Sequence, residues 1–164
     1  MYKKTITYVD FNGKERTEDF YFDISETELI LLDAKTPEGY LERMQIIGNK
    51  QDKREIMDMF TNFLRVAYGE KSPDGRFFDK SEEISRRFEH CAAYNVLFLE
   101  LLQDAKRAAK FVNAVLPFNT EQHKEFEKAV NAKLDELEKK EAEAKEAVDD
   151  TPVTPIVTDG NIEE

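Results

Sequence analysis

Few side chains in this sequence could act as nucleophiles, bases or metal ligands: two histidines, one cysteine and many carboxylates. His90 and Cys91 are adjacent in the sequence, but neighbouring side chains on a helix point about 100° apart. Their adjacency therefore does not indicate that the cysteine is a nucleophile activated by the histidine. A small thiol on an apolar helix is usually a core residue. His123 belongs to a charged segment, where a solvated side chain is a simpler interpretation than a metal ligand. No His-x-x-x-His or Cys-x-x-Cys spacing occurs, so the sequence predicts no metal site.

The glycines and carboxylates also have structural interpretations. Gly69 and Gly75 do not indicate a phosphate loop, because the Gly-Lys-Ser/Thr ending and a preceding strand are both missing from the pattern. Several glutamates fall in the first turns of expected helices, where a negative charge complements the helix dipole. These are Glu26, Glu28, Glu38, Glu55, Glu82 and Glu83. We therefore predict a protein that is not an enzyme and that needs no cofactor.

Composition and charge narrow the choice of partners. The chain has 164 residues, enough for one domain, and a net charge of -11. Because sequence-independent nucleic-acid affinity comes from Lys and Arg that neutralise phosphates, this charge argues against a nucleic-acid partner. Most of the charge lies at the end of the chain: from Asp135 to Glu164, eleven acids face three lysines, which gives -8 and leaves -3 for the preceding residues.

Cysteine usage and hydropathy indicate a compartment. Cys91 is the only cysteine, so no disulfide can form within the chain. No apolar run approaches the roughly 18 residues of a membrane helix, and the first residues do not read as a signal peptide. We therefore expect no membrane association and a reducing cytoplasm.

The N-terminal residues predict a β-hairpin. Apolar and polar residues alternate on both sides of Asn12-Gly13, over about residues 5–24. A two-residue turn would not place apolar side chains opposite one another, so we expect a longer loop or a bulge near Lys14 that pairs Ile6 with Phe20. A lone hairpin is marginally stable in water, so this one must pack on helices or pair with another strand.

Capping signals and apolar periodicity predict about five or six helices after the hairpin. Gly48-Asn49 is expected to end the second of them, and Gly69 the third. The expected N-terminal caps of the first four are Ser25, Thr36 (followed by Pro37 in the first turn), Asp52 and Ser81.

The later helices are less clearly bounded. The sequence does not decide whether residues 89–93 continue or interrupt the fourth helix. Tyr94–Leu116 forms a broad apolar stripe, typical of a helix central to a bundle, and Pro117 ends it. Thr120 should cap a last, charged helix. Its apolar face consists of Phe126, Val130, Leu134 and Leu137.

These patterns predict an α+β fold that is mainly α. We expect a hairpin plus helical domain over residues 1–120 and a charged C-terminal helix over 121–148. An acidic tail over 149–164 should be disordered, because it has too little apolar surface to offset the entropy of ordering.

Aromatic side chains gather around a predicted type I turn at Ser72-Pro73-Asp74-Gly75. The simpler interpretation is a core at the junction between helices. The alternative is an exposed groove for a partner peptide. On that alternative the partner-binding candidates are Tyr68, Phe77, Phe78, Phe88 and Phe98.

Several segments, in this order, resemble those of tail assembly chaperones of long-tailed phages that infect Gram-positive bacteria. The segments are the Asn12-Gly13 hairpin, the strand Phe20-Tyr21-Phe22, the stretch from Tyr68-Gly69 to Gly75-Arg76-Phe77, and the helix end Phe111–Pro117. The resemblance covers roughly residues 4–117 and includes no catalytic signature.

The resemblance implies a function in the host cytoplasm. Such a chaperone coats the tape measure protein and keeps its long apolar helices soluble until tail tube subunits polymerise around it. It implies the tape measure protein as a partner, with the tail tube protein as a second one. Weak self-association is a further implication, and the exposed edges of the hairpin are its expected route.

The residues are also compatible with a second function. An acidic regulatory protein of the phage or its host could bind a basic surface by mimicking nucleic acid. Such binding would weaken steeply with salt, whereas capture of an apolar helix face would not. Against this function, most of the negative charge lies in the tail that is expected to be disordered.

Overall fold

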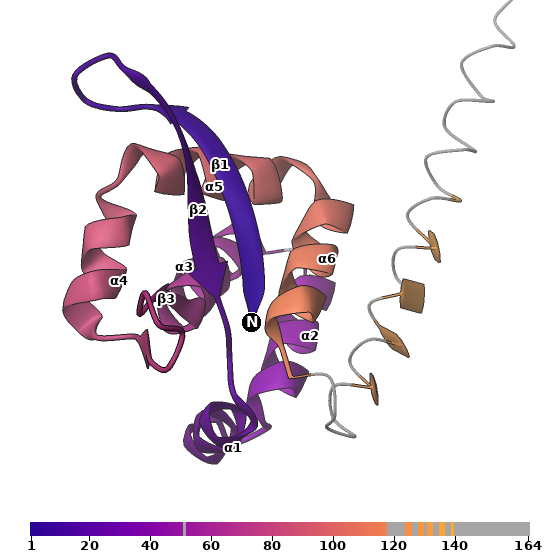
Figure 1. The fold of residues 1–164 in the computed structure, drawn as a ribbon. Helices are drawn as coiled ribbons and strands as arrows, with labels where there is room; N and C mark the ends of the chain where they lie inside the picture. The colour runs from indigo at the N-terminus through magenta and orange to yellow at the C-terminus, as the bar shows by residue number, and fades with distance from the viewer. Residues whose placement is uncertain are drawn as a thin grey trace, which may run out of the picture.

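The computed structural model describes residues 1–50 and 52–117, together with positions 124, 125, 128, 129, 131, 132, 135, 136 and 139. The elements are, in order, β1 (Tyr2–Val9), β2 (Glu15–Phe22), α1 (Glu26–Lys35), α2 (Tyr40–Lys50), α3 (Lys53–Ala67), β3 (Tyr68–Lys71), β4 (Phe78–Asp79), α4 (Glu82–Glu89), α5 (Ala92–Gln103) and α6 (Ala105–Val115). Figure 1 shows the hairpin packed over α5, with its tip projecting beyond the helices. The predicted fold, mainly α with an N-terminal hairpin, is confirmed.

The hairpin has the longer loop that was expected. The N–H of Asp10 donates to the carbonyl of Lys14 at 2.8 Å, and Gly13 takes a φ of +78°, as in a turn followed by a glycine bulge. The Asp10 carboxylate accepts hydrogen bonds from the N–H groups of Asn12 and Lys14. It also pairs with Arg16 at 2.6 Å. These contacts with Asp10 fix the loop.

The register of the hairpin differs from the prediction. Ile6 lies opposite Glu18 and not opposite Phe20, so the expected pairing was wrong by two residues. The bulge at the turn sets this offset. Because side chains alternate with a period of two, a shift of two residues keeps every side chain on its face. Ile6 and Phe20 are therefore on one face, as expected. The buried residues of the hairpin strands are Ile6, Tyr8, Phe20 and Phe22.

The residues after α3 form a strand where the sequence predicted a helix end and a turn. Strand β3 pairs antiparallel with β2, with Phe22 opposite Tyr68, and β4 completes a sheet of order β1-β2-β3-β4. Gly69 belongs to β3 and therefore does not terminate α3, which ends at Ala67. The expectation that the hairpin would pair with another strand and pack on helices is confirmed.

Gly69 is needed for close packing between β3 and β4. A Cβ at this position would lie 2.7 Å from the ring of Phe78 and 2.8 Å from the carbonyl oxygen of Asp79. The predicted tight turn follows it: the N–H of Gly75 donates to the carbonyl of Ser72 at 2.9 Å, and Gly75 has a φ of +72°. The stretch therefore combines two short strands with the expected turn.

The predicted start and end of the second helix were wrong. The Thr36 hydroxyl donates to the carbonyl of Leu32 at 3.0 Å, so Thr36 ends α1. Helix α2 starts at Tyr40, whose N–H donates to the Asp33 carboxylate at 2.6 Å. The helix continues through Gly48-Asn49, because a helical glycine costs only about 1 kcal/mol, which packing can offset. The other predicted caps are confirmed: Ser25, Asp52 and Ser81.

The long apolar stripe Tyr94–Leu116 is divided between two helices. Asp104 interrupts it, and its carboxylate accepts hydrogen bonds from the N–H groups of Lys106 and Arg107, each at 3.0 Å. A capping carboxylate starts a new helix here, although the apolar pattern continues across it. The question at residues 89–93 is also resolved, because α4 ends at Glu89 and α5 begins at Ala92.

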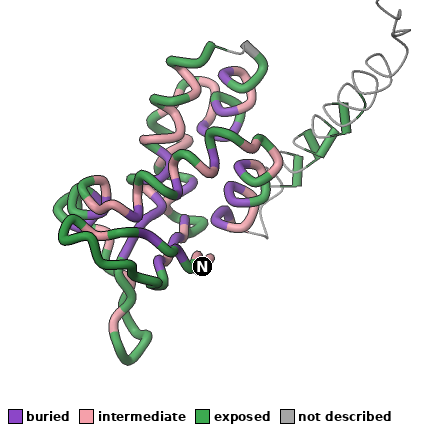
Figure 2. Tube along the Cα trace, turned by 90° about the horizontal axis from the view of Figure 1, so that it is seen from above, coloured by how far each residue is buried: buried purple, intermediate pink, exposed green. Residues whose placement is uncertain are grey.

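One apolar core joins the sheet to the helices. Figure 2 shows buried residues in the interior and exposed residues along the projecting hairpin. A half-buried ion pair between Lys4 and Glu100, 2.8 Å long, ties β1 to α5. The largest fully buried side chains are Phe22, Phe63, Ile24, Leu29, Leu64, Leu97, Leu116 and Val115.

The predictions for the end of the chain fall largely outside the described residues. The described positions between 124 and 139 are helical and exposed, in the region expected as a charged helix. The cap at Thr120, the boundaries at 120 and 148, and the disordered tail over 149–164 lie outside the described residues and stay predictions.

Candidate functional site

Two of the five predicted partner-binding residues are core residues. Tyr68 and Phe88 are 7% and 3% exposed, and their rings stack with centroids 4.0 Å apart and an interplanar angle of 17°. Burial raises the pKa of the Tyr68 phenol to about 12. Together with their ring neighbours they form what we call the aromatic cluster: Phe20, Phe22, Tyr68, Phe88 and Phe111.

The other three candidates differ in exposure and belong to two parts of the fold. Phe77 is 66% exposed in the turn before β4, whereas Phe78 is half-buried beside Gly69. Phe98 is half-buried on α5, stacked on Tyr94 at 5.6 Å. The structure therefore does not bring the five residues together as one surface. A partner-binding role for the exposed Phe77 stays a prediction.

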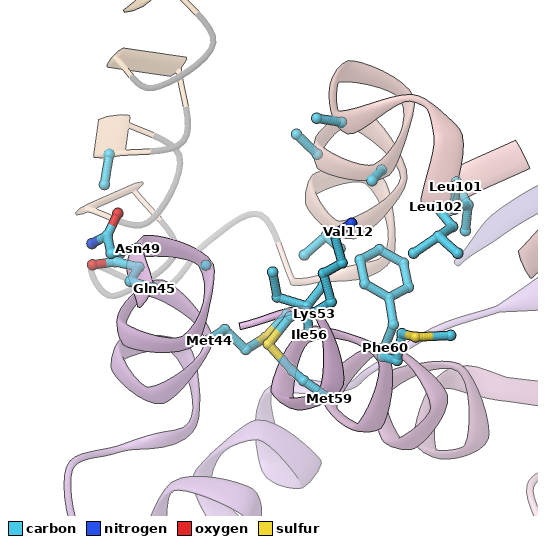
Figure 3. A pocket seen from close by; sticks show the side chains of 16 residues that line it. Met44, Gln45, Asn49, Lys53, Ile56, Met59, Phe60, Leu101, Leu102 and Val112 are labelled. Carbon is cyan, nitrogen blue, oxygen red and sulfur yellow. The ribbon is translucent and has the colours of Figure 1, made fainter. Parts of the chain in front are cut away.

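An apolar groove of about 640 Å³ opens on another part of the molecule (Figure 3). Its walls come from residues within 44–49 of α2, 53–60 of α3, 101–102 of α5 and 105–112 of α6, and Ala129 also lines it. We call it the methionine groove. Met44, Met57 and Met59 line it, and they are all the methionines of the chain except Met1.

The groove combines soft and small side chains. Methionine is unbranched and polarisable, so it adapts to partners of different shape. On the α6 side, Ala105, Ala108 and Ala109 leave room for another helix to approach closely. Leu102 and Met57 are 45% and 40% exposed, which leaves apolar surface open to solvent.

Three polar side chains line the groove: Gln45, Asn49 and Lys53. Figure 3 shows Gln45 and Asn49 at the α2 end, whereas Phe60, Leu101 and Leu102 lie toward the other end. A mainly apolar groove with a few polar groups is typical of a site that takes the apolar face of a helix.

The Asp104 cap positions two walls of this groove. Because the chain turns at Asp104, the end of α5 and the start of α6 both contribute side chains to the same site. The opposite wall, α2, is held by the Asp33 contact at its first residue and by an ion pair of 2.6 Å between Arg43 and Glu38. The groove therefore forms between helices with defined ends.

The sequence interpretation missed this groove because it treated its residues as helix faces turned toward the core. A signal was present: the three internal methionines fall within two consecutive expected helices, and small alanines repeat over residues 105–109. Hydrophobic periodicity identifies an apolar face, but it does not show whether another element covers that face.

The described part of the chain contains no cluster of metal-ligand side chains. No group of three or more His, Cys, Asp and Glu there could hold a metal ion. Cys91 is half-buried at the start of α5, and its neighbour His90 is exposed. Among the described helices, none is long and apolar enough to cross a membrane.

Comparison with known proteins places the chain in a family. A family model described as phage tail assembly chaperone matches residues 1–161. Searches of the curated proteins and of the solved structures gave no match. The family match extends from the hairpin through the groove-forming helices to nearly the last residue, and the chain therefore belongs to the phage tail assembly chaperones.

Proposed function

We propose that this chaperone binds apolar helical segments of the tape measure protein in the methionine groove and keeps that protein soluble during tail assembly in the host cytoplasm. The observation that carries the proposal is an open, methionine-lined groove between four helices in a member of the tail chaperone family. The tail tube protein is a second proposed partner, which would act when the chaperone is released.

The chemistry of the groove suits reversible binding. Each Leu or Ile side chain that a partner helix buries contributes about 1.5–3 kcal/mol before the entropy of association is subtracted. Three or four such anchors give an affinity that solubilises a helix and still permits displacement. Many short apolar helices of one long partner could be bound in this way, because methionines adapt to different side chains.

The net charge supports the same function. Like charge on many bound copies would resist association of the complexes, and the chain carries -11. The groove itself is apolar, so its affinity should depend weakly on salt, unlike that of an acidic mimic of nucleic acid.

Co-expression with the tape measure protein of the same phage gene cluster tests the proposal. The soluble fraction of the tape measure protein should rise in the presence of this chain, and the two should co-purify at low and at high salt. A tape measure protein that stays insoluble beside a folded chaperone would contradict the proposal. Co-purification that is lost at high salt would favour the acidic mimic instead.

Matched variants locate the binding site in the same assay. Met57→Glu/Leu102→Glu places two charges on exposed apolar positions of the groove and should abolish solubilisation. Ile30→Glu/Leu31→Glu makes the same change at exposed apolar positions on α1, outside the groove, and should leave it intact. Equal loss in both variants would move the site away from the groove.

We also propose weak self-association through β1. This strand is at the edge of the sheet, and its outward positions are exposed along its length. An unpaired strand edge can add a strand from a second copy. Native mass spectrometry at rising concentration should show a dimer, and only monomer at high concentration would contradict self-association.

A further inference from the structure

We propose that the chain's own segment 118–139 docks in the methionine groove, so that a partner helix must displace it. The docking itself involves only this chain. Its effect on partner binding rests on the proposed function above. The occupant is thus an internal competitor, tethered beside the site for which it competes.

The first observation is that the segment follows α6, a helix that lines the groove. Ala129 is among the residues that line the groove, and it follows the end of α6 by only fourteen positions. Because α6 supplies one wall of the groove, the following segment is tethered at the site itself. A short tether gives an effective concentration in the millimolar range, so even a weak contact is populated.

The second observation is the sequence pattern of the segment. Phe126, Val130, Leu134 and Leu137 recur at spacings of four, four and three, which places them on one face of a helix. This face is about 17 Å long at the usual helical rise. The remaining faces are mostly polar and are exposed at the described positions: Lys124, Glu125, Lys128, Asn131, Asp135, Glu136 and Lys139.

The two surfaces complement each other. The groove is lined mainly by apolar side chains, and it has a volume of about 640 Å³ with Ala129 among its lining residues. The segment has a single large apolar face and is otherwise mostly polar, which is the form of a helix that lies in a groove. A second copy of the chain would also have to present an apolar helix, but it would lack the tether.

Methionine oxidation by dilute peroxide tests the docking without any partner protein. Met57 and Met59 report on the groove, whereas Met1 is exposed and serves as an internal reference. In the full-length chain, Leu134→Glu places a charge on the apolar face of the segment. We expect the oxidation rates of Met57 and Met59 to rise at least about threefold relative to Met1, since sulfoxide formation follows exposure.

Ala132→Glu is the matched control, because it adds the same charge on the far face, where Ala132 is exposed. It should leave the methionine rates unchanged. Val130→Glu provides a second variant on the apolar face and should reproduce the effect of Leu134→Glu. Urea unfolding confirms that the variants compared are equally stable.

The outcomes separate the two proposals. Unchanged rates at Met57 and Met59 in both apolar-face variants would overturn the docking, whatever the partner does. Faster oxidation in those variants but not in the control would support it, even if the tape measure protein failed to bind. If both proposals hold, Leu134→Glu should also bind the tape measure protein more tightly than the unmodified chain.

Discussion

The buried core and the methionine groove lie on different faces of the same two helices, α3 and α6. On α3, one face buries Phe63, Leu64 and Ala67 completely, while the other presents Met57 and Met59 to the groove. Helix α6 also has two different faces: Phe111 packs into the aromatic cluster, and alanines on the other face line the groove. On both helices, one face packs into the core and the other lines the groove.

The core and the groove contain different types of side chain, and these types suit different roles. Aromatic rings on the sheet side meet in specific edge and stacked arrangements, which fixes a single packing. Flexible thioethers and alanines on the groove side leave space and accept many shapes. Stability should therefore depend mainly on the first region and binding mainly on the second.

The largest effect is expected in the aromatic cluster. Phe88→Ala removes a ring that stacks on Tyr68 and contacts Phe20 and Phe22, so unfolding free energy should fall by about 3–5 kcal/mol. Phe77→Ala, at an exposed ring, should cost less than about 0.5 kcal/mol. Urea unfolding measures both, and comparable losses would break the distinction between buried and exposed aromatics.

Alanine substitutions at two glycines should change the stability of the protein in opposite directions. Gly69→Ala would place a methyl group 2.8 Å from the Asp79 carbonyl oxygen and should destabilise the protein by about 1–3 kcal/mol. Gly48→Ala, within α2 at the groove, meets nothing within 4 Å and should stabilise by about 0.5–1 kcal/mol. Thermal unfolding measures the direction of both changes in stability. A stabilising Gly69→Ala would show that β3 and β4 are not packed as described.

Alkaline pH should weaken the protein through buried phenols. Burial raises the pKa of Tyr68 and of Tyr40 to about 12. A raised folded-state pKa contributes stability that is fully present below the unfolded value, near 10, and is lost as the pH rises through the folded value. Stability should therefore decline between about pH 10 and pH 12, and less steeply in Tyr40→Phe/Tyr68→Phe.

Urea midpoints measured across this pH range test the alkaline prediction. Equal slopes in the double variant and in the unmodified chain would assign the decline to other groups. One such group is Tyr8, whose pKa is raised first by its hydrogen bond to Glu18 and then by burial.

Much of the fold could be predicted from local chemistry. Ser25, Asp52 and Ser81 each place a side-chain acceptor at a helix start, and the structure confirms all three. Thr36 and Asp104 show the limit: both are capping residues, but only neighbouring contacts decide whether a cap ends one helix or starts the next. The register of the hairpin depended on the contacts of Asp10 within the loop, which alternation of side chains does not encode.

The candidate site was harder to predict than the fold. Aromatic residues near the central turn attracted attention, yet Tyr68 and Phe88 are closed into the core by β2 and α4. The groove arises where α2, α3, α5 and α6 meet. That arrangement depends on how distant segments pack, and no local pattern in the sequence expresses it.

Hydrogen exchange of the full chain, alone and with the tape measure protein, tests the division of roles most directly. We predict that binding slows exchange in residues 44–60 and 101–112, which form the groove, and leaves residues 68–88 of the sheet side unchanged. Met57→Glu/Leu102→Glu should remove this protection. Protection confined to the hairpin tip and the turn with Phe77, with no change in the groove, would contradict the account.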